Sequence, residues 1–389
     1  MAERETVKRS VIRYDSDDDQ TNLSLSDELV EEIMIWLPTN TLFRCKCVCK
    51  RWQALISASS LVERVKSLPT LTTGFFLCVD LPDVLTKPEV YFYQTDPKAI
   101  RLESSLSFLH KSVVPVASHE GFLLCVERPD SGIFSVIDSF SYILCNPYAK
   151  QWVTLPKPRS DHRIKFVTLY CYKKEGSNTD TFEFKVVSLI DVFCHNVIEL
   201  EIYSSDTGQW EELTFFHHLG FLRPSCPIVL LDGAIHFWNP DNRCLCVYNL
   251  KEESIRFMEL PVGSFDSCAM GMGHLGVSAE SLYYSEGSKN HFRVWVLDGA
   301  EWFLKHSIDF ESLVDELEET FESDYLFYPV AFHPLNDNIV LARLIHSPKV
   351  VLYHMDTTRI EVVKNIDSSL YFPVIPYALS AWHPFVKHH

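Results

Sequence analysis

The sequence predicts a multi-domain protein of the α plus all-β class: a small N-terminal three-helix domain followed by a six-bladed β-propeller. Three observations lead to this fold class. Residues 25–66 have helical periodicity, and from about residue 74 the chain consists of short strand-like runs broken by turn residues. A strand–turn–strand pattern then recurs six times. The length of 389 residues suits one small and one large domain.

Shifts in composition give the expected domain boundaries. Residues 1–22 form a polar, acidic tail that we expect to be disordered, because it has little apolar surface to bury. We expect the helical domain over 23–66, a linker over 67–73 and the propeller over 74–385. Ser16 stands before three aspartates and so resembles an acidophilic kinase site, although a solvated tail explains the same run.

The first predicted helix has one apolar side. Leu29, Ile33 and Leu37 recur at i, i+4 and i+8 and therefore form a stripe. Ser26 is suited to cap the start of this helix, since its hydroxyl can accept a backbone hydrogen bond. Pro38 ends it, because the residue before a proline avoids the α region.

Two more short helices are predicted, one containing Leu42 and one containing Val48, Trp52, Leu55 and Ile56. Three helices of this length enclose little core by themselves. An apolar stripe left exposed on them predicts a surface that docks on another protein.

The repeat in the large domain is marked by a polar turn residue between two strands. The six turn residues are Asp96, Asn146, Asp206, Asn249, Asp298 and Asp356, with spacings of 50, 60, 43, 49 and 58 residues. Repeats of roughly 40–50 residues with several strands each indicate propeller blades. We expect the last stretch, residues 371–385, to close the ring by completing the first blade. The acidic segment 309–324 is expected to be a solvated insertion, or else a lid or contact loop on one face.

Charge and composition exclude several classes of function. The net charge is −17, of which residues 67–389 carry −16, so the large domain would repel a phosphate backbone and we expect no nucleic-acid partner. No apolar run approaches the roughly 18–20 residues that span a membrane. The N-terminus has no apolar signal segment, so the 12 cysteines are expected to be reduced and the protein cytosolic or nuclear.

The cysteines do not have metal-site spacing. Cys45, Cys47 and Cys49 are closer together than zinc pairs, and on one helix they would point in different directions. Cys244 and Cys246 are expected to face opposite sides of a strand. We therefore expect structural thiols that pack as small hydrophobic groups, and no metal.

No catalytic or cofactor motif is visible either. The sequence contains no G-x-S-x-G or Walker pattern, and none of its 16 histidines lies in a metal or catalytic motif. Gly271, Gly273 and Gly276 match G-x-G-x-x-G, but a dinucleotide site needs a βαβ context. We expect these glycines to form a turn entering a blade and to permit close approach at its centre. No cofactor and no catalytic residue is predicted.

The segment "LSDELVEEIMIWLPTNTLFRCKCVCKRWQALISASSLV" resembles an F-box. The match rests on an acidic first helix, an L-P pair, a leucine-containing helix, V-C-K-x-W and a trailing L-I. It departs from the family at Ser26, where proline is usual; serine caps a helix equally well. The resemblance implies docking on a Skp-type adaptor through Leu25, Leu29, Ile33, Leu37, Pro38, Leu42, Val48, Cys49, Trp52, Leu55 and Ile56.

Residues 118–158 are similar to the signature of plant F-box-associated domains, in which a G-L-L-C run precedes an N-P turn, a tryptophan and L-P. The matching residues are Gly121, Leu123, Leu124, Cys125, Asn146, Pro147, Trp152, Leu155 and Pro156.

Together the resemblances imply a non-enzymatic substrate-recognition subunit of a Skp–cullin–F-box ubiquitin ligase. The F-box would bind the adaptor, through it the cullin and RING subunits, and the propeller would present a target for ubiquitination and degradation by proximity. Two alternatives stay open: a propeller hydrolase, and an adaptor-bound scaffold that directs no degradation. The sequence does not identify the target or the propeller face that binds it.

Overall fold

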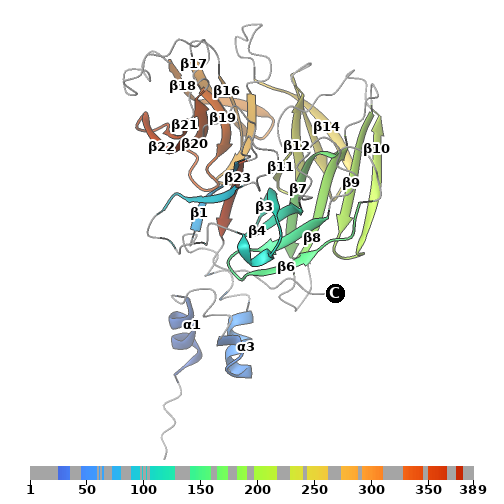
Figure 1. Cartoon of the computed structure of the whole chain (residues 1–389), viewed down its shortest axis with the longest axis vertical. Helices are drawn as coiled ribbons and strands as arrows, with labels where there is room; N and C mark the ends of the chain where they lie inside the picture. Colours follow the sequence, from blue (N-terminus) through green and yellow to red (C-terminus); the bar gives the residue numbers. More distant parts are fainter. Residues whose placement is uncertain are drawn as a thin grey trace, which may run out of the picture. The chain divides into compact units, whose positions relative to one another are not determined.

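The computed structural model describes residues 25–35, 45–58, 61, 64, 72–79, 89–96, 99, 102, 106–127, 141–158, 164–173, 182–190, 197–216, 228–239, 243–261, 273–287, 291–309, 327–344, 349–365 and 374–379. The chain divides into two compact units, Met1–Val62 and Glu63–His389 (Figure 1). The predicted tail with Ser16, the helix-ending pair Leu37 and Pro38, Leu42, and residues 310–324 of the acidic segment lie outside the described residues.

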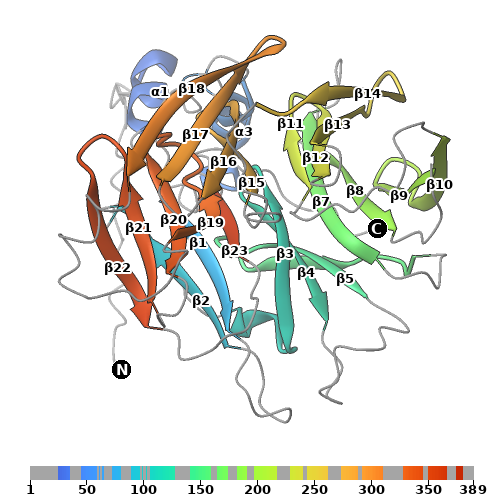
Figure 2. The same cartoon turned by 90° about the horizontal axis from the view of Figure 1, so that it is seen from above.

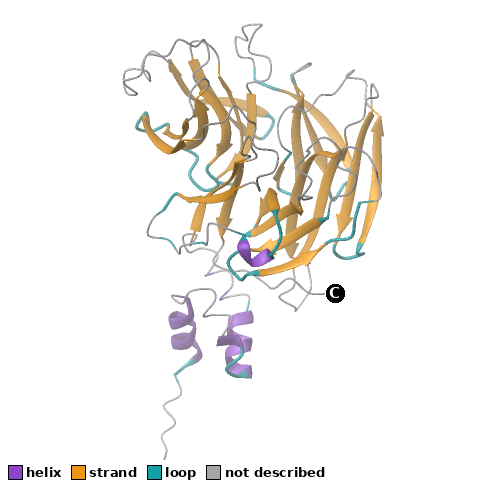
Figure 3. Cartoon of the chain, in the orientation of Figure 1, coloured by secondary structure: helices purple, strands orange, loops and turns teal. Residues whose placement is uncertain are grey.

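The first unit is helical, with α1 over Asp27–Ile35 and α3 over Lys50–Ser57 (Figure 3). α1 begins as predicted. The Leu29 amide donates to Ser26 Oγ at 3.4 Å, and the Val30 amide donates to the Ser26 carbonyl at 3.0 Å. Acidic residues in the first turn of α1 also stabilise it, because they face the positive end of the helix dipole. A middle helix over Leu42 stays a prediction.

The second unit consists of six antiparallel sheets, which we number as blades. Blade 1 contains β23 (Val374–Leu379), β1 (Thr72–Val79) and β2 (Glu89–Gln94). Blade 2 contains β3 (Val113–His119), β4 (Phe122–Glu127), β5 (Tyr142–Asn146) and β6 (Gln151–Thr154). Blade 3 contains β7 (Ile164–Lys173), β8 (Phe182–Ile190), β9 (Val197–Ser204) and β10 (Gln209–Phe216). Blade 4 contains β11 (Val229–Leu231), β12 (Ala234–Asn239), β13 (Cys244–Asn249) and β14 (Ser254–Glu259). Blade 5 contains β15 (Gly273–Ser278), β16 (Ser281–Gly287), β17 (His291–Asp298) and β18 (Glu301–Asp309). Blade 6 contains β19 (Phe327–Phe332), β20 (Ile339–Leu344), β21 (Lys349–His354) and β22 (Arg359–Asn365). In addition, a short 3-10 helix, η1 (Ser107–Leu109), precedes β3 of blade 2.

The six blades form a closed ring. The innermost strand of each blade contacts that of the next: β3 with β7, β7 with β11, β11 with β15, β15 with β19, β19 with β23, and β23 with β3. The sheets are therefore arranged around a common axis (Figure 2). This confirms the predicted six-bladed propeller.

The C-terminal strand closes the ring, as predicted. β1 pairs antiparallel with β2 on one side and with β23 on the other, so that Phe76 lies opposite Phe92 and Ile375. Blade 1 thus combines strands from the two ends of the large unit. β1 begins at Thr72, two residues before the predicted start of the propeller.

The hydrophobic core consists of layers between neighbouring blades rather than one central mass. Separate buried clusters join blades 1 and 2, 2 and 3, 3 and 4, 4 and 5, 5 and 6, and 6 and 1. Each blade therefore hides the faces of its neighbours, which is how a stack of sheets buries surface that one sheet cannot. Trp210 Nε1 donates to the Pro156 carbonyl at 2.9 Å, and Trp302 Nε1 to the Glu259 carbonyl at 3.1 Å; both bonds join consecutive blades.

The predicted turn residues occupy equivalent places. Each ends or closely follows the third strand of its blade, counted from the axis; Asn146 ends β5 in blade 2 and Asn249 ends β13 in blade 4. Asn146 Oδ1 accepts the amides of Tyr148 and Ala149 at 3.1 and 3.0 Å. Asn249 Oδ1 likewise accepts two amides, of the residues two and three positions on. These side chains replace backbone hydrogen bonds that a sharp turn cannot make.

Two local expectations were wrong. Gly273 and Gly276 lie within strand β15 rather than in a turn, although the expected close approach is present: a Cβ on Gly276 would lie 2.6 Å from Phe332 Cδ2. Cys244 and Cys246 do not face opposite sides. Residues two positions apart on a strand point to the same face. Both cysteines are therefore buried on one side of β13, and their thiols are hydrogen-bonded to each other.

Candidate functional site: an apolar surface on the helical unit

Helix α1 has two apolar sides. Val30, Met34 and Ile35 are buried and form the inner side. The outer side consists of Leu29 and Ile33, which are 54% and 51% exposed, and Leu25, which precedes the helix and is 49% exposed. Because the inner side supplies the packing, the outer side is not needed to bury the helix within this chain.

Val48, in the turn before α3, is also exposed, at 63%. We call Leu25, Leu29 and Ile33 the outer apolar surface. Large apolar side chains exposed to this extent at several neighbouring sequence positions mark interaction sites more often than isolated ones do.

The starts of α1 and α3 are tied together by one arginine. Arg51 Nε donates to Asp27 Oδ1 at 2.8 Å, and Arg51 Nη2 donates to the Leu25 carbonyl at 2.5 Å. The ion pair is exposed at both partners and contributes at most about 1 kcal/mol. Its structural effect is to hold Leu25 beside the N-terminus of α3.

The remaining predicted docking residues fall into four groups. Cys49 is exposed, and Trp52 and Leu55 are partly buried. Ile56 is fully buried, so it has no surface to offer a partner; we reassign it from docking to the interior of the chain. Leu37, Pro38 and Leu42 lie outside the described residues. Sequence periodicity alone could not separate Ile56 from its neighbours, because a contact stripe and a core stripe have the same spacing.

The closely spaced cysteines differ from the prediction. Cys45 is helical, Cys47 lies in a turn and Cys49 precedes α3, so they do not share one helix. Cys47 and Cys49 are exposed, so the expectation that they pack as small hydrophobic groups is wrong for these two. Cys49 instead caps α3: its Sγ accepts the Trp52 amide at 3.5 Å. The position of Cys49 directly before a helical run was the sequence signal that could have predicted this cap.

The cysteines of the strands behave as predicted. Cys78, Cys125, Cys145 and Cys171 are all buried in the propeller. Burial raises the pKa of the Cys125 and Cys171 thiols well above the ordinary value, because it disfavours the thiolate. Within the described part of the chain, no group of three or more histidine, cysteine or acidic side chains is placed to hold a metal ion. No described helix has both the length and the apolar character needed to cross a membrane.

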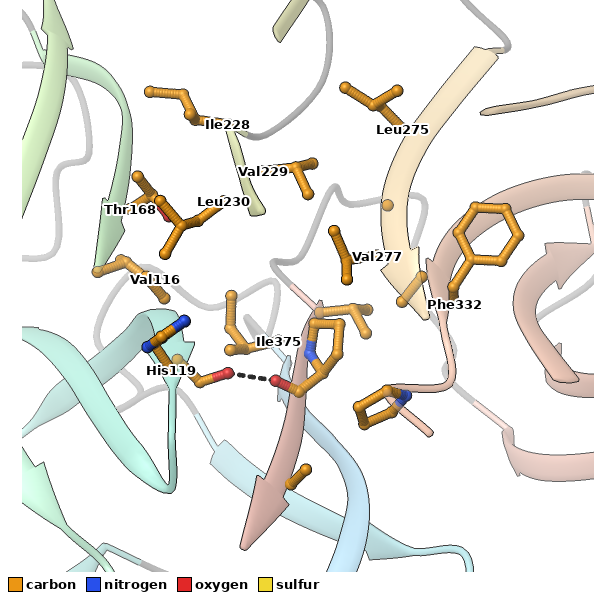
Figure 4. A pocket seen from close by; sticks show the side chains of 18 of the residues that line it. Val116, His119, Thr168, Ile228, Val229, Leu230, Leu275, Val277, Phe332 and Ile375 are labelled. Atoms are coloured by element: carbon orange, nitrogen blue, oxygen red, sulfur yellow. Dashed lines mark hydrogen bonds between the residues drawn. The ribbon is translucent and has the colours of Figure 1, made fainter. Parts of the chain in front are cut away.

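A second feature lies on the propeller axis, where strands of all six blades enclose a cavity of about 250 Å³ (Figure 4). Its described lining is mainly valine, isoleucine, leucine and proline. Glu286, whose pKa burial raises to about 7, lies on β16 and is not among the lining residues. The described lining contains one carboxylate, Glu120, so it does not present the pair of carboxylates that the hydrolase alternative requires.

The fold and this surface define a class of protein: a small helical unit with exposed apolar side chains, joined to a six-bladed propeller. The F-box domain model matches residues 22–64. The model for the β-propeller of F-box protein At3g26010-like matches residues 99–372. The chain therefore belongs to the F-box proteins that carry an At3g26010-like β-propeller.

Similar proteins in Arabidopsis thaliana align with this chain over most of their length. F-box protein At5g03970 is 25% identical over 92% of this chain and 88% of its own length. F-box protein At5g07610 is 23% identical over 77% of this chain and 74% of its own length. Among solved structures, a putative 6-phosphogluconolactonase from Bacteroides fragilis is 9% identical, with a TM-score of 0.42 over 79% of this chain and 98% of its own. A likeness at that level carries no information on activity.

Proposed function

We propose that this chain is the substrate-recognition subunit of a Skp–cullin–F-box ubiquitin ligase and acts in the cytosol or nucleus. Its helical unit docks on the Skp-type adaptor, which connects it to the cullin and RING subunits. Its propeller holds a target protein near the charged conjugating enzyme. The chain itself performs no chemistry in this role, because holding the target raises its effective concentration at the thioester.

The observation that carries this proposal is the outer apolar surface. Leu25, Leu29 and Ile33 remain about half exposed even though α1 has a complete inner side. A Skp-type adaptor that binds this F-box helix would cover the apolar side chains that the chain itself leaves exposed. Burying such side chains in an interface stabilises the complex by roughly 25 cal/mol per Å² of apolar area removed from water.

The substitution Leu29→Asp tests the docking surface. It places a charge where the interface must exclude water, and we expect adaptor affinity to fall by about 2 kcal/mol or more, roughly thirtyfold. Leu304→Asp on β18 is the matched control. Leu304 is 56% exposed against 54% for Leu29, so both substitutions change the same residue type at nearly the same exposure, one in each unit.

Adaptor binding is measured by titration of purified Skp-type adaptor against the full chain, with circular dichroism confirming that each variant is folded. Loss of binding in Leu29→Asp with retention in Leu304→Asp supports the assignment. Equal affinities for the wild type and Leu29→Asp would show that the outer apolar surface is not the docking site.

Degradation of the target is a separate step of the proposal. Proximity labelling with the full chain, with and without a proteasome inhibitor, distinguishes a degradative receptor from an adaptor-bound scaffold. A partner that accumulates only on inhibition is a degraded target. Partners whose abundance does not change would favour the scaffold.

A further inference from the structure

We propose that the axial cavity of the propeller binds a small, uncharged, mostly apolar molecule that carries a hydrogen-bond acceptor. This goes beyond target recognition, because it assigns a ligand site to the interior of the ring. The cavity volume of about 250 Å³ lies just below the range of roughly 300–1,000 Å³ typical of ligand pockets. It is too small to admit a folded partner.

The lining exposes apolar surface towards the axis. Val116, Val229 and Val277 lie on or beside the innermost strands β3, β11 and β15, yet each is only partly buried. These side chains pack against the inter-blade layers and also line the cavity (Figure 4). These apolar side chains make no hydrogen bonds to water, so a ligand whose apolar surface covers them gains free energy.

Two polar side chains of the wall form hydrogen bonds to neighbouring blades. Ser118 Oγ donates to the Pro376 carbonyl, joining blades 2 and 1. His119 Nδ1 accepts the Cys171 amide of blade 3 at 3.1 Å. A neutral imidazole whose Nδ1 accepts must carry its proton on Nε2, so the second hydrogen-bonding group of this lining residue is a donor.

The site is also free of strong charge. Burial lowers the pKa of His119 and of His274 to about 4, so both rings are neutral at physiological pH. Among the described lining residues, Glu120 alone has a side chain that is charged at neutral pH, and it is exposed. An anionic ligand would lose its hydration here without gaining an opposite charge, and a cationic ligand would meet only an exposed carboxylate. The complementary ligand is therefore uncharged, with an acceptor for the donor on His119.

Isothermal titration of the full chain with acetophenone tests this, with ethylbenzene, benzoate and benzylammonium as comparisons. Acetophenone and ethylbenzene have nearly the same shape, and only the ketone carries an acceptor. We expect both to bind saturably at one site, and the two ions not to bind. In His119→Phe, the affinity for acetophenone should fall by about fivefold, which corresponds to the loss of one net hydrogen bond. The affinity for ethylbenzene should stay the same, which would show that the cavity is intact.

Filling the cavity provides the second arm. Val277→Phe and Val229→Phe place a ring in the space from two different blades, and each should weaken both ligands by about tenfold or more, since little volume remains. Val362→Phe on β22 is the matched control, because Val362 is exposed on the outermost strand. Two filling variants are used so that misfolding of one leaves the other informative.

Three results would overturn the proposal. They are no saturable binding of either uncharged ligand, unchanged binding in both filling variants, or binding of benzoate as tight as that of acetophenone. Adaptor affinity is measured in the same variants. Because the cavity and the outer apolar surface belong to different units, loss of ligand binding with normal adaptor binding separates this inference from the proposed function.

Discussion

The helical unit and the propeller both expose apolar side chains, but in opposite geometries. In the helical unit, Leu25, Leu29 and Ile33 project from the convex side of a helix. In the propeller, Val116, Val229 and Val277 line a concave space between strands. A convex stripe is covered only by a partner with a groove, whereas a cavity of about 250 Å³ is filled only by something small.

The two surfaces also arise from different levels of structure. The stripe follows from the period of one helix and needs no distant contacts. The cavity exists only because six innermost strands close a ring, so it depends on pairing between the two ends of the large unit. Substitutions that damage one surface should therefore leave the other intact, and three of them test this separation.

The largest effect on stability is expected at β23, the strand that closes the ring. Tyr377 on β23 is fully buried, its ring packs edge-on against Phe76 at 5.3 Å, and its hydroxyl donates to the Gly121 carbonyl of blade 2 at 2.8 Å. Tyr377→Ala should lower the free energy of unfolding of the propeller by about 3–5 kcal/mol through lost burial and cavity creation. Urea denaturation followed by tryptophan fluorescence measures this.

Tyr377→Phe separates the two contributions of this side chain. It keeps the ring and removes only the hydroxyl, so we expect a loss of about 1 kcal/mol. Adaptor binding by Tyr377→Phe should equal that of the wild type. If the alanine and phenylalanine variants were equally stable, packing at the ring closure would not be what holds the cavity walls.

The sequence predicted the outer turns of the blades better than it predicted the contacts around the propeller axis. Asn146 and Asn249 mark turns between neighbouring strands, where residue type and conformation are linked over three or four positions. The contacts among β3, β7 and the other innermost strands join residues tens of positions apart. No local pattern encodes which of them meet, and so the cavity was not predicted.

The outer apolar surface shows the same limit on a smaller scale. Periodicity identified Leu29 and Ile33, which are exposed, but it did not single out Val30 and Met34 as the buried side of the same helix. It also grouped Ile56 with the contact residues, although Ile56 is buried. Spacing gives the side of a helix, while which side is covered depends on the packing of the other helices.

A smaller effect is expected at the junction of blades 5 and 6. Asp337 accepts a hydrogen bond from the Tyr283 hydroxyl at 2.9 Å and forms an ion pair with Lys305, which lies at a β-bulge in blade 5. The hydrogen bond from Lys305, and to a lesser degree that from Tyr283, holds the pKa of Asp337 below its ordinary value. Because the site is partly exposed, Asp337→Asn should cost at most about 1 kcal/mol at neutral pH.

The pH dependence of this variant has a definite sign. A carboxyl whose pKa is lowered by folding stabilises the protein above its unfolded pKa of about 3.9, and this stabilisation is lost as the pH falls through the lower folded value. The difference in unfolding free energy between the wild type and Asp337→Asn should therefore shrink below about pH 4. A difference that grew on acidification would contradict the ion pair. Adaptor binding should not change at neutral pH.

The smallest effect concerns the cap of α3, in the other unit. Cys49 Sγ accepts the Trp52 amide at 3.5 Å, and a thiol is a weaker acceptor than a hydroxyl. Cys49→Ser should therefore stabilise the helical unit by about 0.5 kcal/mol, and Cys49→Ala should destabilise it slightly. Cys47→Ser is the matched control, because Cys47 is also exposed but does not precede a helix. Thermal unfolding followed by far-ultraviolet circular dichroism ranks the variants, and a serine variant no more stable than the alanine variant would show that position 49 is not a cap. Ligand binding in the axial cavity should be the same in all of them, because the cap orders one short helix and the cavity depends on strands that none of these substitutions touches.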